Sequence, residues 1–118
     1  MEAPLPASSI RYLEQFYAIE YGLPAQEIED IVSCESGGNQ FAKGDYTNGI
    51  PTSFGLVQLH NLKDKGLEQW QAYSPLFSLD YLAYHLSIGK GSMWSCYKIT
   101  GWNNQVAMIN HLYAVKDV

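Results

Sequence analysis

The stretch PAQEIEDIVSCESGGN, residues 24–39, has the pattern of a single amphipathic helix with a clear start and stop. Pro24 is typical of a helix start, and the acidic residues of the following turns favour the positive end of the helix dipole. Ile28 and Ile31 lie on the apolar stripe of that helix, and Gly37 opens the glycine pair that ends it. We therefore predict a helix that packs one face against a core.

Glu35 belongs to the same apolar stripe, because it stands seven residues after Ile28 and four after Ile31. Burial and the negative end of the helix dipole both oppose its ionisation, so we expect a raised pKa. A carboxyl group that keeps its proton near neutral pH can protonate a leaving oxygen. The plainer interpretation is an exposed glutamate at a frayed helix end.

The rest of the chain combines helical patterns with one long polar stretch. Residues 39–53 are rich in Gly, Asn, Asp, Thr and Pro, which indicates a long loop or an irregular hairpin, and a short apolar run follows at 54–59. Further helical patterns cover residues 10–21, 67–73, 79–86 with Ser78 as the cap, 93–99, and a last stretch from Asn103 or Asn104 to 113. The sequence thus predicts a mainly α, α+β single domain with about six helices and a small β-hairpin or irregular loop.

Composition fits one globular domain. The chain has 118 residues, of which 47% are hydrophobic and 16% charged, enough for one core but not for two. We assign residues 10–118 to this domain and residues 1–9 to an N-terminal tail or linker. No apolar run of about eighteen residues and no leader with a cleavage site is visible, so we expect neither membrane insertion nor an uncleaved signal.

The charge balance disfavours nucleic acid as a partner. The formal net charge is −5, and the seven basic residues are scattered rather than clustered. Binding to a phosphate backbone draws its affinity from clustered Lys and Arg. We expect no nucleic-acid partner, and we expect the chain to act as a monomer.

Two cysteines, Cys34 and Cys96, lack the close paired spacing of a zinc site. His60, His85 and His111 show no ligand spacing either, so we expect no metal and no cofactor. The cysteines are equally compatible with a disulfide, in an oxidising compartment, and with two reduced buried thiols. A thiol nucleophile at Cys34, as in a peptidase, is a weaker hypothesis because no family signature surrounds it.

Two motifs carry a family resemblance. The segments CESGGN (34–39) and SFGLVQ (53–58) resemble the soluble lytic transglycosylases and goose-type lysozymes, in which a helix ending in Glu-Ser precedes a Gly-Leu-Met-Gln-like segment. Val57 stands where those families usually have Met. Tyr97 is similar to the tyrosine of the transglycosylases' Tyr-Asn-Ala-Gly motif, although Lys98 replaces the Asn. The resemblance extends over residues 10–113 and implies a lysozyme-like fold.

The resemblance implies a muramidase that acts on peptidoglycan glycan strands. Glu35 would be the catalytic acid, and Ser53, Gln58 and Tyr97 would contact the substrate. The expected reaction is lytic transglycosylation of the β-1,4 bond between N-acetylmuramic acid and N-acetylglucosamine, which needs one acid because the sugar's own C6 hydroxyl attacks. Such an enzyme works outside the cytoplasm, whether periplasmic, secreted or delivered by a phage as an endolysin.

Asp45 is the candidate second carboxylate of an alternative mechanism. An inverting hydrolase needs a base that activates water, and the Gly44-Asp45 pair resembles a Gly-Asp that precedes the Gly-Leu-Met-Gln segment of goose-type lysozymes. The spacing to Gly55 is longer here, and the surrounding GDYTNG favours an ordinary solvated turn. The alternatives to transglycosylation are therefore a hydrolytic goose-type lysozyme that uses Asp45, and a cell-wall glycan-binding module without catalysis.

Overall fold

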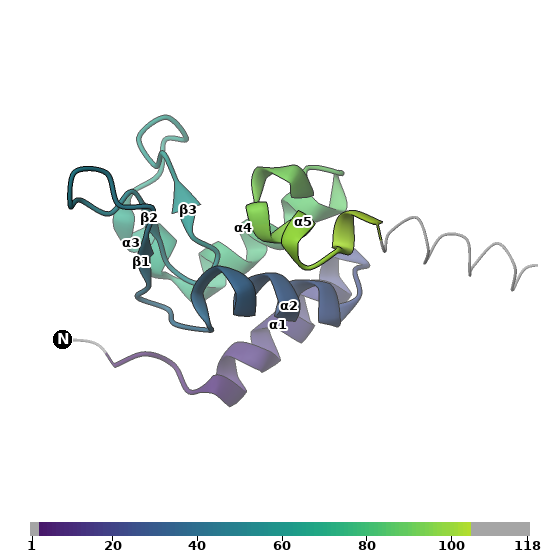
Figure 1. Ribbon diagram of the computed structural model, residues 1–118. Helices are drawn as coiled ribbons and strands as arrows, with labels where there is room; N and C mark the ends of the chain where they lie inside the picture. Colours follow the sequence, from purple (N-terminus) through teal and green to yellow (C-terminus); the bar gives the residue numbers. More distant parts are fainter. Residues whose placement is uncertain (1–2, 105–118) are drawn as a thin grey trace, which may run out of the picture.

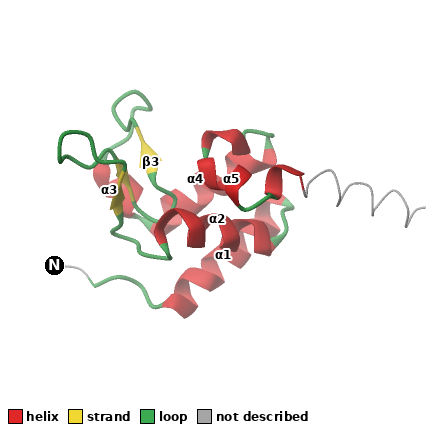
Figure 2. Ribbon diagram, viewed as in Figure 1, coloured by secondary structure: helices red, strands yellow, loops and turns green. Residues whose placement is uncertain are grey.

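The computed structural model describes residues 3–104, which form a mainly helical domain with a small antiparallel sheet (Figures 1 and 2). The fold class predicted from the sequence is thereby confirmed. The helices of the described part are α1 (Ala7–Tyr21), α2 (Ala25–Ser36), α3 (Gln69–Tyr73), α4 (Pro75–Ser87), the 3-10 turn η1 (Gly91–Met93) and α5 (Ser95–Ile99). The strands are β1 (Lys43–Gly44), β2 (Ser53–Phe54) and β3 (Leu59–His60).

Helix α1 begins earlier than predicted, at Ala7 rather than at Ile10. Pro6 has an extended backbone, and its carbonyl oxygen accepts hydrogen bonds from the N–H groups of Ser9 and Ile10 at 3.0 and 3.1 Å. Residues 7–9, which we placed in the N-terminal tail, therefore belong to the first turn. Their side chains are small, and those of Ala7 and Ser8 are exposed, so the apolar periodicity could not show that these residues are helical.

The core lies where α2 and α4 meet the short loop between β2 and β3. Ile28 and Ile31 of α2 and Leu79 and Leu82 of α4 are completely buried there. Helix α1 packs against both α4 and α2, as Figure 1 shows for the long helices at the base of the molecule. This helical layer fixes α2 from one side and leaves its C-terminal end pointing toward the sheet.

The polar stretch 39–53 is a hairpin rather than a free loop. Strand β2 is central and pairs antiparallel with β1 and with β3, so that Gly44 and His60 both lie opposite Ser53. The tip of the β1–β2 hairpin is closed by a bridge between Thr47 and Ile50. Asn48 and Gly49 between them both have positive φ, 53° and 78°, as a tight type I′ turn requires.

Helix α4 starts four residues before the predicted start at Leu79, because its cap is Ser74 and not Ser78. The Ser74 hydroxyl accepts a hydrogen bond from the N–H of Phe77, and Pro75 occupies the first helical position. Ser78 is instead fully buried inside the helix. Helix α3 agrees with the predicted segment 67–73 and begins with a capping box between Glu68 and Gln71.

The helix predicted over 93–99 is interrupted at Trp94. The Trp94 backbone is extended, with φ −112° and ψ 127°, so η1 ends before it and α5 starts after it. The last predicted helix, from Asn103 or Asn104 to 113, lies mostly outside the described residues. No helix within residues 3–104 is long and apolar enough to span a membrane.

Candidate functional site

A cleft of about 540 Å³ opens between the C-terminal end of α2 and the sheet. Glu35 lies on its α2 side, and Asp45 and His60 reach it from the ends of β1 and β3. Met93, the last residue of η1, and Trp94, which precedes α5, form a further wall. Tyr46 also lines the cleft and is 62% exposed, so aromatic and apolar surface is available for a sugar ring beside polar groups.

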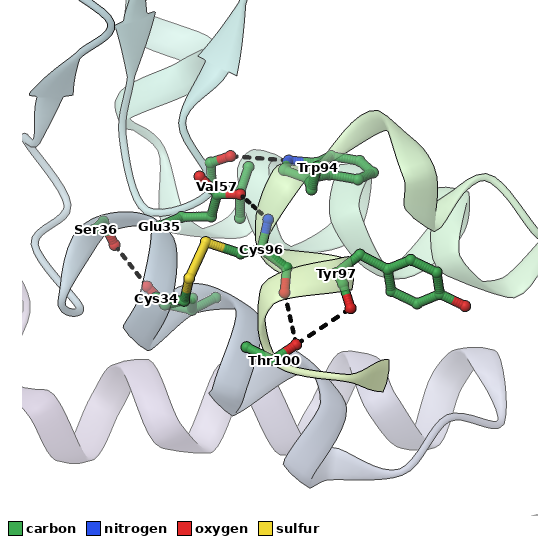
Figure 3. The surroundings of a disulfide bond; sticks show 9 residues. Cys34, Glu35, Ser36, Val57, Trp94, Cys96, Tyr97 and Thr100 are labelled. Carbon is green, nitrogen blue, oxygen red and sulfur yellow. Dashed lines mark hydrogen bonds between the residues drawn. A yellow bond between two sulfur atoms is a disulfide. The ribbon is translucent and has the colours of Figure 1, made fainter. Parts of the chain in front are cut away.

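Glu35 is half-buried and has one hydrogen bond to the backbone. Its carboxylate oxygen Oε2 accepts the N–H of Cys96 at 3.2 Å, in the first turn of α5 (Figure 3). Burial raises the pKa of Glu35, the Cys96 hydrogen bond lowers it, and the nearby negative charge of Asp45 raises it again. The net change is an increase, as predicted from the position of Glu35 on the apolar stripe.

A disulfide joins Cys34 to Cys96, with 5.9 Å between the two Cα atoms. Of the two states that the sequence allowed, the bonded one is present, and neither cysteine offers a free thiol as a nucleophile. The bond links the residue before Glu35 to the residue whose N–H holds the Glu35 carboxylate (Figure 3). It therefore fixes the two elements that position this side chain.

Trp94 ties the same region to the sheet. Its indole Nε1–H donates a buried hydrogen bond of 2.9 Å to the carbonyl oxygen of Val57, in the loop between β2 and β3. Figure 3 shows this bond directly beside Glu35. The wall of the cleft formed by η1 and α5 is thus anchored at both ends, by the disulfide to α2 and by Trp94 to the sheet loop.

Asp45, Ser53 and His60 form a connected row across the sheet. The Ser53 hydroxyl donates to Asp45 Oδ2 at 2.5 Å and lies 3.0 Å from His60 Nδ1. Asp45 is therefore not the isolated turn residue that its sequence context favours. Ser53, which we predicted to contact substrate, is fully buried and does not line the cleft, so that prediction is wrong in its direct form.

Gln58 lines the cleft, but its amide group serves the backbone. The Nε2 group donates to the carbonyl oxygens of Ala42 at 3.2 Å and Gly55 at 3.0 Å. A Cβ atom at Gly44 would lie 2.2 Å from Gln58 Oε1, so Gly44 has to be glycine for this side chain to pack. The two hydrogen bonds of Nε2 hold the segment before β1 against the β2–β3 loop. The predicted contact of Gln58 with substrate stays a prediction, and the residue does line the cleft.

Tyr97 does not belong to the cleft. Its side chain points away from Glu35 in Figure 3 and packs under Gly91, where a Cβ atom would lie 2.7 Å from the ring. Burial raises the pKa of Tyr97, and the negative charge of Glu27 raises it further. Glu27 lies two turns before Glu35, about 12 Å away along α2, so Tyr97 is near a different part of that helix. The structure therefore does not bring Tyr97 to the cleft at Glu35, because α5 directs successive residues to different sides and Cys96 takes the side of Glu35.

The sequence analysis missed His60 as a member of the site. A signal was present, because Ser53 and His60 flank the run 54–59. If residues 55–58 form a four-residue hairpin loop, Ser53 and His60 become cross-strand partners. We interpreted the run only as an apolar segment. Within residues 3–104, no group of three His, Cys, Asp or Glu side chains is arranged to hold a metal ion.

A second hollow, of about 330 Å³, lies between α1 and α2. It is lined by Glu14, whose pKa burial raises to about 7, and by Arg11, which forms an ion pair of 4.0 Å with Glu29. Glu14 is only 6% exposed. Gln26 and Ser33 of α2 also line this hollow. The cleft at Glu35 is the better candidate, because Glu35 is only half-buried there whereas Glu14 is almost completely buried.

Comparisons of the chain with protein-family models, with curated proteins and with solved structures gave no match in any of the three.

Proposed function

We propose that this protein cleaves the glycan strands of peptidoglycan, with Glu35 as the group that protonates the leaving oxygen. The observation that carries the proposal is a carboxyl group with a raised pKa that opens to a polar cleft. A glycosidic oxygen leaves readily only when it is protonated, and a raised pKa lets a carboxyl keep the proton it donates up to a higher pH. The substrate class rests on the resemblance of CESGGN and SFGLVQ to the lytic transglycosylases and goose-type lysozymes.

Two routes can follow protonation. In lytic transglycosylation, the expectation from the family resemblance, the C6 hydroxyl of the bound sugar attacks its own C1 carbon. In hydrolysis, a water molecule attacks C1 and a second carboxylate takes its proton. Asp45 favours the second route here, because its carboxylate lines the same cleft as Glu35 and is held there by Ser53.

Hydrolysis by this pair balances as follows. The bond between C1 and the glycosidic oxygen breaks, and the Glu35 proton passes to that oxygen. The water oxygen bonds to C1, and one water proton passes to Asp45. Exchange with solvent then returns Glu35 to its protonated and Asp45 to its ionised form.

The compartment is proposed from the disulfide. The bond between Cys34 and Cys96 suits an oxidising environment, where such bonds form and persist. Peptidoglycan also lies outside the cytoplasm. The proposed substrate and the disulfide therefore both support an extracytoplasmic site of action.

The experiment replaces Glu35 by glutamine, which has nearly the same shape but cannot donate a proton as an acid. We expect Glu35→Gln to lower the rate of peptidoglycan lysis at least a hundredfold without lowering the melting temperature. The matched control is Glu20→Gln on the exposed face of α1, which should lyse at the wild-type rate. Comparable lysis by Glu35→Gln and wild type would refute the role of Glu35, and absence of lysis by the wild type would favour a glycan-binding module.

A further inference from the structure

Ser53 is unusual among the serines of the described chain in that its hydroxyl is completely buried and still has two side-chain partners. It is 0% exposed, donates to Asp45 Oδ2 at 2.5 Å and lies 3.0 Å from His60 Nδ1. The strand register explains the arrangement, since His60 is the cross-strand partner of Ser53 and Asp45 follows Gly44, the partner on the other side. Three strands thus bring one hydroxyl, one carboxylate and one imidazole together.

Hydrogen counting assigns the direction of the two bonds. A serine hydroxyl has one hydrogen and accepts through its lone pairs. Because that hydrogen goes to Asp45, the contact with His60 requires that the imidazole donates Nδ1–H to Ser53 Oγ. This bond is available to both the neutral and the protonated ring, so the row Asp45–Ser53–His60 keeps its direction in either charge state.

The row leaves one atom of Asp45 available for chemistry. Oδ2 takes the Ser53 hydrogen bond, whereas Oδ1 has no hydrogen-bond partner among the described residues, and the Asp45 side chain is 68% exposed. Asp45 also adopts a left-handed backbone, with φ 51°, and its carbonyl oxygen accepts the Thr52 hydroxyl. The backbone and one carboxylate oxygen are thus held by hydrogen bonds, and the other oxygen belongs to a side chain that lines the cleft.

We propose that His60 is a positioning residue which, through the buried Ser53 hydroxyl, orients the Asp45 carboxylate so that its free oxygen receives the proton of the attacking water. The inference rests on the proposed hydrolysis and adds two residues to it. His60 Nδ1 also lies 4.0 Å from Asp45 Oδ2. The hydroxyl alone can rotate, and the imidazole fixes it with its hydrogen toward Asp45.

The test uses the full chain and a soluble glycan substrate cut from peptidoglycan, on which kcat and KM are measured separately. His60→Ala should lower kcat roughly tenfold to a hundredfold and change KM less than twofold, because misdirecting a reacting group affects the chemical step. His60→Asn places an amide N–H near the position of Nδ1 and should restore most of the lost kcat. Lys63→Ala, an exposed change three residues away, is the matched control and should match wild type.

A double-mutant cycle separates positioning from mere packing. Ser53→Ala should lower kcat about as much as His60→Ala, and the double variant should lose no more than either single one, because both break the same row. Since His60 is half-exposed, its variants should fold, and thermal melts monitor this.

The results of these experiments test the positioning role of His60 separately from the proposed glycan cleavage. If wild type cleaves the glycan and Glu35→Gln does not, but His60→Ala keeps wild-type kcat, the positioning role is wrong while the proposed function stands. Equal losses in His60→Ala and His60→Asn would also contradict it, since the Nδ1–H donor would then be irrelevant. If wild type does not cleave the substrate, the proposed function itself has failed.

Discussion

Two carboxyl groups of one helix show why a raised pKa alone does not identify a catalytic residue. Glu27 and Glu35 both lie on α2, and burial is the first cause of the raised pKa in both. Glu27 is only 3% exposed, however, and its pKa reaches about 7 without any access to the cleft. Glu35 differs because it opens to a cleft whose opposite wall carries polar groups.

The buried Glu27 should make folding stability depend on pH. Because the folded protein holds this proton more tightly than the unfolded chain, whose Glu pKa is near 4.5, the stabilisation is complete below that pH. It is lost as the pH rises to about 7, where the folded carboxyl ionises. Glu27→Gln should therefore raise the free energy of unfolding at pH 8 by about 1–3 kcal/mol and leave it nearly unchanged at pH 4.

Urea unfolding at both pH values measures the effect of Glu27→Gln, with the exposed Glu20→Gln as the control. The same gain at pH 4 and pH 8 would indicate a change in packing rather than in proton binding.

At the scale of elements, the site depends on how α5 is fastened. The disulfide joins α5 to α2, and the buried Trp94 hydrogen bond joins the residue before α5 to the loop between β2 and β3. Glu35 lies between these two connections and uses the N–H of Cys96. A five-residue helix is too short to hold this position by itself, so its fastening controls the geometry of the acid.

Replacing both cysteines by serine should test this fastening. The disulfide closes a sequence separation of 62 residues, for which the chain-entropy model gives a stabilisation of about 4 kcal/mol. We expect Cys34→Ser with Cys96→Ser to lose about that much in urea unfolding. Under conditions where the variant is still folded, kcat should fall several-fold because the Cys96 N–H no longer holds Glu35 rigidly.

Reduced wild-type protein is the natural control and should behave like the double variant. Unchanged stability after reduction would show that the two segments are held together mainly by other contacts.

The elements that the sequence predicted well have strong local signals. Helix α2 ends at Ser36 and is followed by Gly37 with φ 65°, as the glycine pair indicated, and its stripe of Ile28 and Ile31 is buried. The helix over 93–99 was predicted without its break, because the extended backbone of Trp94 comes with a contact 37 residues away, to Val57. The row of Asp45, Ser53 and His60 depends on strand register, which a short apolar run does not specify by itself.

At the scale of the whole molecule, the two halves of the proposed chemistry come from different parts of the fold. The helical layer carries Glu35 at the end of α2, and the sheet carries Asp45 at the end of β1, with the cleft between them. The local sequence around Asp45 is that of an ordinary turn. Only the packing of the sheet against the helices brings Asp45 into the same cleft as Glu35. Whether water or the sugar's C6 hydroxyl attacks C1 therefore depends on the assembled domain. The chemical form of the new strand ends reveals which of the two attacks.

Mass spectrometry of purified peptidoglycan after digestion by the wild-type protein tests the central claim most directly. We expect shortened glycan strands whose new ends are reducing sugars, heavier by one water than anhydro ends, because in the proposed hydrolysis water attacks C1 and Glu35 protonates the leaving oxygen. Anhydro ends would retain Glu35 as the acid but contradict the use of Asp45 and water. Glycan strands of unchanged length after prolonged digestion with the folded protein would contradict the claim that this cleft cuts them at all.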